Sequence, residues 1–348
     1  MRYNVEKLTD FCRRVMEAAG LTAEEADVFA QSLVYADLRG VASHGVTRLS
    51  VYSKRVSCGA IRPNAQPEIL SDSGAVITVD GRDGIGSYVA RKSVDWCIER
   101  AERLGCCCAS VKNGTHFGSA AFFTEYAAKK GMICYVISNS EAAVVPTGGA
   151  KPMLGTNPLS LAIPAGRYEP YVLDMATSTV ARGKVVLAQK EGHSIPNDWG
   201  VDKNGAPTTD PAAILDGGAM LPFGGPKGYA ISLMIDLMCS GLSGSLNCRN
   251  TPGFWTDFEH HQNLGYFICV IDPRKFMPQE AYDAQIDGIL DEFKACPTAP
   301  GVKEVMIPGE IEHNKYVAGL ELGVELSEAV VNDLVETGKR YGIEADFI

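Results

Sequence analysis

The fold class is decided by AVITVDG (75–81), GIGSYVARKSVDWCIERAERLG (84–105), CCCASVKN (106–113), FGSAAFFTEYAAKKG (117–131) and MICYVISNS (132–140). Short apolar runs here alternate with longer segments of helical composition. The first helical segment ends at Gly105, a residue type that commonly follows the last turn of a helix. Strand–helix–strand alternation is typical of a sheet covered by helices, so the sequence predicts an α/β fold.

Helices are also predicted at both ends of the chain. Thr22 and Glu25 form a Thr-x-x-Glu capping box ahead of a helical run, and Ser327 is a suitable N-cap for an amphipathic helix. Residues 141–222 are rich in Gly, Pro, Thr and Asn, which is typical of short strands and long loops. The apolar stretch GPKGYAISLMIDLMCSGLSG (225–244) predicts a helix that is buried on all sides.

Composition excludes several classes of function. The 348 residues carry a net charge of -10, which argues against nucleic acid or an anionic membrane as the main partner. The 11 cysteines include no Cys-x-x-Cys pair, so zinc and iron–sulfur spacing is absent and no metal site is predicted. Neither an apolar signal core nor a membrane-spanning run is present. We therefore expect a cytoplasmic protein with reduced, mostly buried thiols.

The segment ADLRGVASHGVTR (36–48) brings together residues suited to a small carboxylic acid. His44 and Arg48 are four residues apart and follow a second arginine, Arg39. On a helix, residues at this spacing lie on one face. An imidazole can exchange a proton near neutral pH, and a guanidinium can bind a carboxylate through two hydrogen bonds. The alternative is an exposed His and Arg on a solvated helix face.

Two glycine-containing turns could bind a ligand. Gly84 and Gly86 follow a strand, but position 89 is Val and no acidic residue ends the next strand, so a tight turn is favoured over a Rossmann dinucleotide site. His116 lies between a strand end and a helix start, where the helix dipole lowers the pKa of an imidazole. A neutral His116 could accept the proton of an alcohol, or it could simply cap the helix.

Other polar positions are informative only in combination. The loops around Ser140 could surround a ligand or be plain turns. Asp174, after an apolar strand, could orient a catalytic histidine or cap a helix. Lys227, at a Gly-flanked helix start, could bind a cofactor phosphate or be a solvated lysine.

Together these segments resemble the malate/L-lactate dehydrogenase type 2 family. The resemblance runs from about residue 36 to 310 and rests on RGVASHGVTRLSVY, THFGSAAFF, VVPTGGAKPMLGTNPLSLAIPA, LDMATSTVARGKV, DKNGAPTTDP, GPKGYAISLMIDL and IPGE. The family also contains sulfolactate and ureidoglycolate dehydrogenases, 2,3-diketogulonate reductases and a cyclic imino acid reductase. This chain is most similar to the ureidoglycolate dehydrogenases, in SIPNDWGVDKNGAPTTDP and in the acidic Glu141 after Ser140.

The resemblance implies a homodimer with a non-Rossmann nicotinamide-binding fold, in which flanking helices cover a mixed sheet. Its expected lobes are a helical lobe formed by both chain ends (1–72 and 312–348), a mixed-sheet cofactor lobe (73–135 and 223–311) and an inserted small lobe (136–222). The implied activity is hydride transfer between NAD, or alternatively NADP, and a small 2-hydroxy/2-oxo acid, an oxidoreductase acting on CH–OH groups.

The resemblance also implies roles for individual residues. Arg48 is expected to hold the substrate carboxylate, while His44 and His116 flank the reacting oxygen, with His116 favoured as the proton-exchanging group. Ser140 is expected to contact substrate and nicotinamide, and Asp174 is the third predicted catalytic residue. The expected cofactor-binding residues are Ser140, Asp174, Met175, Ala176, Lys227, Pro308, Gly309 and Glu310.

One departure bears on the substrate. Ureidoglycolate dehydrogenases carry a substrate-contacting Arg where this chain has Gln262, which we take as the corresponding substrate-binding position. The change removes one contact to an anion or ureido group and leaves the hydride chemistry untouched. Malate, lactate and sulfolactate therefore stay open beside ureidoglycolate. The alternatives are a reductase of another carbonyl or imine acid, such as 2,3-diketogulonate or a cyclic imino acid, and a non-catalytic dinucleotide sensor.

Overall fold

The structure is a computed structural model that describes residues 1–348. Its apolar runs form one mixed sheet of seven strands. The strand order is β2-β3-β4-β10-β5-β6-β7, and only β3 and β4 run parallel. The predicted α/β class with a mixed sheet is confirmed. The strands are β2 (Glu68–Asp72), β3 (Val76–Asp80), β4 (Cys106–Gly114), β5 (Ile133–Ser138), β6 (Leu159–Ile163), β7 (Tyr171–Met175) and β10 (Leu264–Ile271).

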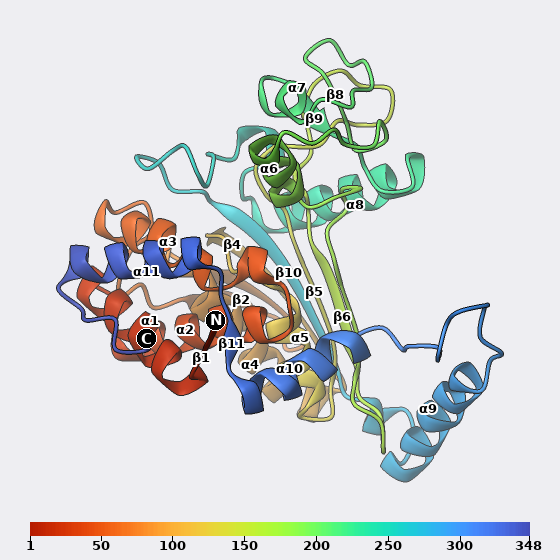
Figure 1. Cartoon of the computed structure of the whole chain (residues 1–348). Helices are drawn as coiled ribbons and strands as arrows, with labels where there is room; N and C mark the ends of the chain where they lie inside the picture. The colour runs from red at the N-terminus through yellow and green to blue at the C-terminus, as the bar shows by residue number, and fades with distance from the viewer.

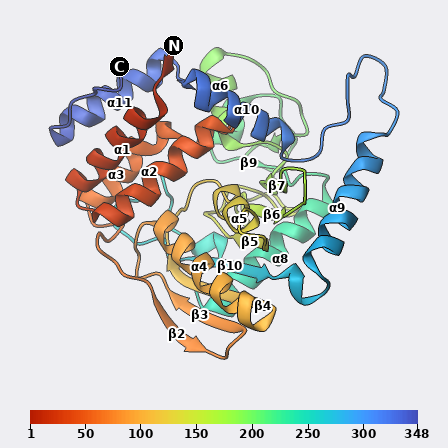
Figure 2. The same cartoon turned by 90° about the horizontal axis from the view of Figure 1, so that it is seen from below.

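Helices lie on both faces of the sheet because its central strands, such as β5 and β10, bury side chains on both sides. Helix α4 (Gly86–Leu104) forms the crossover between the two parallel strands, and α5 (Ala121–Ala128) packs against β5 and β6. The opposite side carries α8 (Pro226–Ser243), which packs on β10, β4 and β5. Helix α9 (Gln279–Lys294) projects away from the body, on the side opposite the helical lobe (Figure 1, Figure 2).

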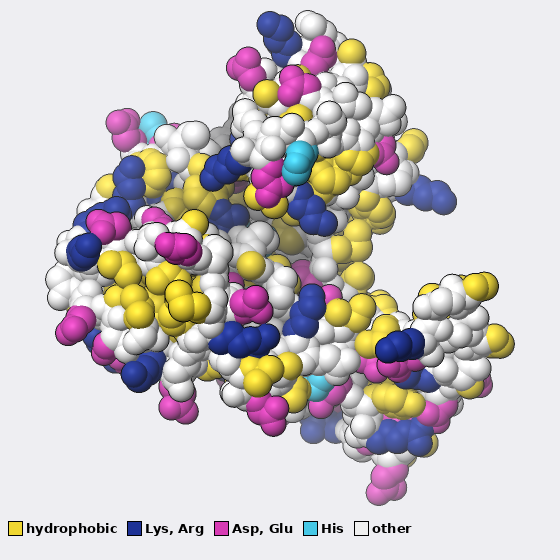
Figure 3. Space-filling view, in the orientation of Figure 1, with side chains coloured by type: hydrophobic (Ala, Val, Ile, Leu, Met, Phe, Trp, Pro, Cys, Tyr) yellow, Lys and Arg dark blue, Asp and Glu magenta, His cyan; other side chains and the backbone are white.

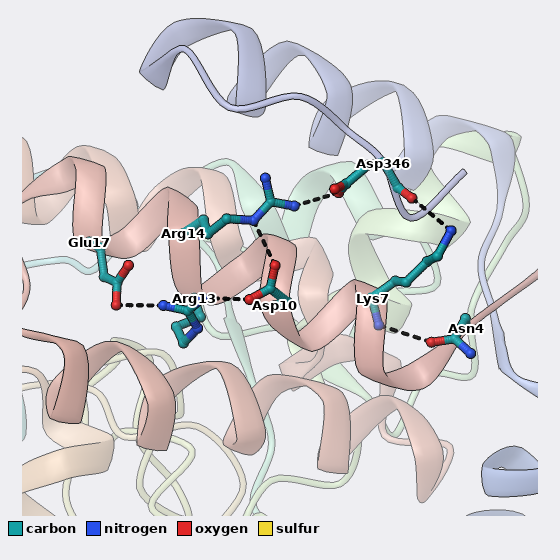
Figure 4. A network of polar contacts seen from close by, with 7 residues as sticks. All are labelled: Asn4, Lys7, Asp10, Arg13, Arg14, Glu17 and Asp346. Carbon is teal, nitrogen blue, oxygen red and sulfur yellow. Dashed lines mark hydrogen bonds and ion pairs between the residues drawn. The ribbon is translucent and has the colours of Figure 1, made fainter.

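A helical lobe combines the two ends of the chain. It contains α1 (Val5–Ala19), α2 (Ala23–Leu38), α3 (Leu49–Ser57) and α11 (Glu328–Tyr341), and a two-stranded sheet pairs β1 (Arg2–Tyr3) with β11 (Val324–Glu325). The predicted caps are confirmed, because Thr22 and Glu25 form a complete capping box and the Ser327 side chain accepts from Val330 N–H. Figure 4 shows a polar network, including the Arg14–Asp346 ion pair, that joins α1 to the C-terminal segment.

A small lobe stands apart from the helical lobe, at the top of Figure 1. It holds α6 (Arg182–Glu191), β8 (Gly200–Val201), α7 (Pro211–Leu215) and β9 (Ala219–Met220) around its own apolar cluster, which includes Val144, Ile195 and Ile214. Strands β6 and β7 also fall within 136–222, but they extend the main sheet. The exact lobe limits stay a prediction.

The prediction that α8 is buried on all sides is wrong. One face of the helix, including Ile235 and Cys239, packs under the sheet, but Met234, Leu237 and Leu242 lie on the surface, with Leu237 64% exposed. The helix is apolar all round, yet this chain supplies no second layer to cover its outer face. No helix is both long and apolar enough to span a bilayer.

Candidate active site

A cavity of about 560 Å³ lies where the helical lobe, the sheet and the small lobe meet. Figure 3 shows the molecule hollowed between the upper small lobe and the helical lobe. Segments far apart in the sequence form its walls, namely 39–48, 116–121, 138–143, 172–176, 181–183, 254–255 and 306–312. The volume is within the usual range for pockets that bind drug-sized ligands.

His44 and Arg48 reach this cavity from two short 3-10 turns rather than from one α-helix. The turns Ala42–His44 and Val46–Arg48 meet at Gly45, where a Cβ would collide with the Asp37 carboxylate. That carboxylate accepts the Val46 N–H at 2.7 Å and so fixes the bend. Both predicted side chains therefore line the same cavity.

The Arg48 guanidinium is held in place from two sides. Its Nε donates to the Ser43 carbonyl oxygen at 2.5 Å, and its plane lies over the Trp255 ring, 4.1 Å from the ring centroid. No carboxylate of the chain forms an ion pair with it. An oriented cation that faces a cavity and has no anionic partner is suited to binding a substrate carboxylate.

His116 follows strand β4 and stacks on His44. The two rings lie 5.6 Å apart between centroids, with 16° between their planes, and the Phe254 ring lies 4.8 Å from His116. The Gln262 Oε1 accepts the His116 backbone N–H at 3.1 Å. Helix α5 begins only at Ala121, and its N-cap residue, Ala120, has no side-chain cap. His116 is thus a cavity residue and not the N-cap of α5.

Both imidazoles are held neutral at pH 7. Burial lowers the pKa of His44 to about 4, and the positive charge of Arg48 adds to this effect. Burial also lowers the pKa of His116 well below its usual range, with contributions from His44, Arg48 and Arg55. A neutral imidazole can accept a proton, which is the form that alcohol oxidation requires.

The lowered pKa of His44 predicts a loss of stability in acid. The unfolded chain binds a proton at His44 near pH 6.5 but the folded chain only near pH 4, so stability is full above pH 6.5 and falls between these values. We expect urea unfolding to show a loss of about 2–3 kcal/mol from this group over that window. His44→Gln should lose less stability between pH 7.5 and pH 4.5 than the wild type. The control is His193→Gln, at a side chain that is 71% exposed, and its stability should change with pH as in the wild type. If stability falls equally with pH in all three proteins, the loss does not come from His44.

Asp174 lies in the cavity wall at the end of β7. Its Oδ2 accepts hydrogen bonds from Ser119 Oγ at 2.9 Å and from the Ala121 N–H at 3.0 Å. The second bond gives an N–H of the first turn of α5 an acceptor that comes from a distant strand. No hydrogen bond joins Asp174 to either histidine, and its catalytic role stays a prediction. Burial raises the pKa of this carboxyl, opposed by those two hydrogen bonds.

The other predicted cofactor-binding residues, together with the predicted substrate-binding Gln262, divide into two groups. Ser140, Met175, Ala176, Pro308 and Gly309 line the same cavity as the histidines. Lys227, Gln262 and Glu310 do not. Lys227 is exposed at the start of α8, Gln262 is fully buried behind His116, and Glu310 forms an ion pair with Lys294 at 2.9 Å.

Sequence reasoning missed several cavity residues. Phe254 and Trp255 come from a loop whose composition gives no functional signal, and they meet His116 and Arg48 only through the fold. The sequence places Arg39 close to His44 but predicts no role for it. It is 3% exposed, forms an ion pair with Glu125 at 2.7 Å, and donates to the Gly309 carbonyl oxygen at 3.4 Å.

Comparison with known proteins now identifies the family. Residues 3–335 match the sequence model of the malate/L-lactate dehydrogenase family. The chain belongs to this family. The predicted family is therefore confirmed, and the chain is an oxidoreductase of the dehydrogenase class.

Three relatives illustrate the range of the family. L-Sulfolactate dehydrogenase of Methanocaldococcus jannaschii is 36% identical and covers 95% of each chain, and its solved structure superimposes with a TM-score of 0.92 over 99% of both chains. Malate dehydrogenase of Pyrococcus horikoshii is 34% identical over 99% of this chain and 96% of the relative. Ureidoglycolate dehydrogenase (NAD(+)) of Escherichia coli K12 is 35% identical over 96% and 95%. Because the three sequence identities are nearly equal, they do not indicate which of the three substrates this chain uses.

Proposed function

We propose that this member of the malate/L-lactate dehydrogenase family transfers a hydride between NAD, or alternatively NADP, and a small 2-hydroxy/2-oxo acid. The observation that carries the proposal is the convergence of two neutral, stacked histidines and one arginine without an anionic partner in a single cavity. The arginine supplies a site for the carboxylate, and the imidazoles supply a proton acceptor next to it.

The chain's residues fit the proposed cofactor on the far side of the histidines. Gly118, with φ at +86°, lies in the cavity wall, and nothing stands within 4 Å of where its Cβ would be, so a ligand can approach the backbone. Ser140, Asp174, Met175, Ala176, Pro308 and Gly309 line the same cavity and are the proposed cofactor contacts. When bound, the nicotinamide accepts or supplies the hydride. Lys227 and Glu310 remain predicted contacts outside the cavity.

Three residues of the site bind the substrate and exchange its proton. The Arg48 guanidinium binds the substrate carboxylate and fixes which carbon faces the cofactor wall. His116 Nε2 then accepts the hydroxyl proton during oxidation and returns it during reduction, while His44 orients the same oxygen. Binding of the substrate carboxylate also neutralises the Arg48 charge that lowers the pKa of His116, so the substrate itself makes protonation of His116 easier.

The test is absorbance at the reduced-nicotinamide band, with NAD or NADP and a panel of acids. The panel contains ureidoglycolate, malate, lactate, sulfolactate and gulonate-type acids, and the corresponding 2-oxo and cyclic imino acids with reduced cofactor. A signal with one hydroxy acid supports the proposal, and a signal only with a diketo or imino acid supports the alternative reductase. Binding of reduced cofactor without turnover of any compound would instead support a sensor.

Glu141 is placed to select the substituent of the substrate that lies away from its 2-hydroxy acid group. Its carboxylate lines the cavity near Arg48, no ion pair or side-chain donor engages it, and burial raises its pKa. An acid in this position disfavours a second anion on the substrate and favours an N–H or O–H group. We therefore propose a ureidoglycolate-like acid as the substrate, in preference to malate or sulfolactate. The neutral Gln262, at the position of the arginine in ureidoglycolate dehydrogenases, supplies no positive charge for this substrate.

Glu141→Gln is expected to shift this preference. Removing the negative charge should raise kcat/KM for malate relative to ureidoglycolate by about tenfold, which corresponds to about 1.4 kcal/mol of relieved repulsion. The ratio is measured by steady-state kinetics on both acids. Glu336→Gln, at an exposed position of α11, is the matched control and should leave the ratio unchanged. An unchanged ratio in Glu141→Gln would separate Glu141 from substrate choice.

The surface supports the predicted homodimer. The outer face of α8, formed by Met234, Leu237 and Leu242, is an uncovered apolar surface of the kind that marks protein interfaces. Sedimentation should therefore give about twice the mass of one chain, and a monomer at micromolar concentration would contradict the proposal. All 11 cysteines are free thiols, which supports the proposed cytoplasmic location.

A further inference from the structure

Tyr52 contacts His116 from the side away from the cavity. It lies on α3 one turn after Arg48, is 1% exposed, and packs edge-on against Phe29 and Phe254. Its hydroxyl approaches two atoms of His116, the ring Nδ1 and, at 3.2 Å, the backbone carbonyl oxygen. This leaves Nε2 as the ring nitrogen without a protein partner.

The two contacts together fix where the hydrogens lie. A phenol has one hydrogen to donate, and a carbonyl oxygen can only accept. If the Tyr52 hydroxyl donates to Nδ1, its contact with the carbonyl oxygen places two acceptors face to face. If it donates to the carbonyl oxygen, the Tyr52 oxygen is free to accept a hydrogen from Nδ1. Only the second arrangement uses both contacts as hydrogen bonds.

One neighbouring group favours the opposite arrangement. The Gly118 N–H also faces Nδ1, at 3.4 Å. The Gly118 contact is the longest of the three, longer than the 3.2 Å between the Tyr52 hydroxyl and the carbonyl oxygen, so it is the weaker influence. The Tyr52 contacts therefore dominate the choice of tautomer.

We infer that Tyr52 is a positioning residue that holds His116 as the Nδ1–H tautomer, so that the Nε2 lone pair faces the reacting hydroxyl. The inference rests on the proposed function, in which Nε2 accepts the substrate proton. After that transfer, the Nδ1–H bond to the Tyr52 oxygen carries part of the new positive charge. Hydrogen bonds to charged groups are stronger than those between neutral groups, so the contact tightens as His116 becomes protonated.

The surroundings of His116 make this contact matter. The titratable and charged groups that face it are His44 and Arg48 from the two 3-10 turns, and Tyr52 and Arg55 from α3. Both arginines oppose a positive charge on His116, and Phe254 on the remaining side is apolar. Among these titratable and charged groups, Tyr52 is the one whose oxygen can accept a hydrogen bond from the protonated ring.

The first test reads the tautomer without cofactor or turnover. The ring nitrogens of the six histidines are observed by ¹⁵N NMR in the cofactor-free protein, and the His116 signals are identified by their loss in His116→Gln. We expect a protonated Nδ1 and an unprotonated Nε2 at pH 7.5. Tyr52→Phe should move His116 toward the Nε2–H form. A wild-type His116 that is protonated on Nε2, or spectra that do not change in Tyr52→Phe, would overturn the inference.

The second test is kinetic and separates positioning from folding. Tyr52→Phe should lower kcat for oxidation by about 10- to 100-fold with little change in KM. The acid limb of the kcat–pH profile should move to lower pH, because the imidazolium loses an acceptor and its pKa falls. Tyr88→Phe is the control, since Tyr88 is equally buried, does not line the cavity and hydrogen-bonds Gln66 rather than His116. If the wild type turns over no acid, the proposed function fails, and the NMR result still decides the tautomer. An active Tyr52→Phe with an unshifted profile refutes the role of Tyr52 alone.

Discussion

His116→Ala is expected to lower kcat by about 10²–10⁴-fold in both directions, the usual contribution of a positioned acid–base group. His116 is the proposed proton acceptor, with a neutral ring whose Nε2 has no protein partner, and its removal leaves the hydroxyl proton of the substrate without that acceptor. Stopped-flow or steady-state absorbance of the reduced nicotinamide gives kcat. The dissociation constant of NADH, from its fluorescence, should change little because the proposed cofactor contacts, such as Met175 and Ala176, are other residues of the cavity wall.

Two controls make the result decisive. His193→Ala changes an exposed histidine of the small lobe and should retain full activity. His44→Ala should lower kcat less than His116→Ala, since His44 is assigned the orienting role. A fall of less than about threefold in His116→Ala, with a large fall in His44→Ala, would transfer the proton-exchanging role to His44.

Arg48→Ala is expected to weaken substrate binding by about 100-fold while NADH still binds. A charge-assisted pair of hydrogen bonds contributes about 2–3 kcal/mol, and each 1.4 kcal/mol is a factor of ten. Arg48 is prepared for this contact by Ser43 and Trp255, which orient the guanidinium before the substrate arrives. The measurement is KM for the acid, together with the inhibition constant of an unreactive carboxylate such as oxamate.

The controls for Arg48 distinguish shape from charge. Arg48→Lys keeps the charge but loses the two-pronged geometry and the stacking on Trp255, so it should recover only part of the affinity. Arg62→Ala, at a 60% exposed side chain, should change nothing. If Arg48→Ala binds the acid as tightly as the wild type, Arg48 is not the carboxylate anchor.

Local sequence patterns predicted the elements well. The capping box at Thr22, the N-cap at Ser327 and the alternation across 75–140 each depend on residues within a few positions of one another. The burial of α8 could not be read in this way, because an apolar helix predicts only that something covers it, not that the cover belongs to the same chain.

The site was predictable where the resemblance supplied a motif. His44, Arg48, His116, Ser140 and Asp174 line one cavity, although they lie up to 130 residues apart in the chain. Other contacts of the site join elements that no local sequence pattern relates. They are the stacking of Arg48 on Trp255, the hydrogen bond from the Ala121 N–H to Asp174, and the two contacts of Tyr52 with His116. These contacts exist only once the sheet and the lobes are assembled.

The contact between Arg39 and the Gly309 carbonyl oxygen has a consequence for biosynthesis. It joins residues 270 positions apart, so Gly309 is synthesised long after Arg39. A nascent chain that already carries both histidines still lacks the wall formed by 306–312 and the strand that pairs with its own first residues. Since a chain emerges from its N-terminus onward, the cavity is completed only after residues 306–312 have been synthesised.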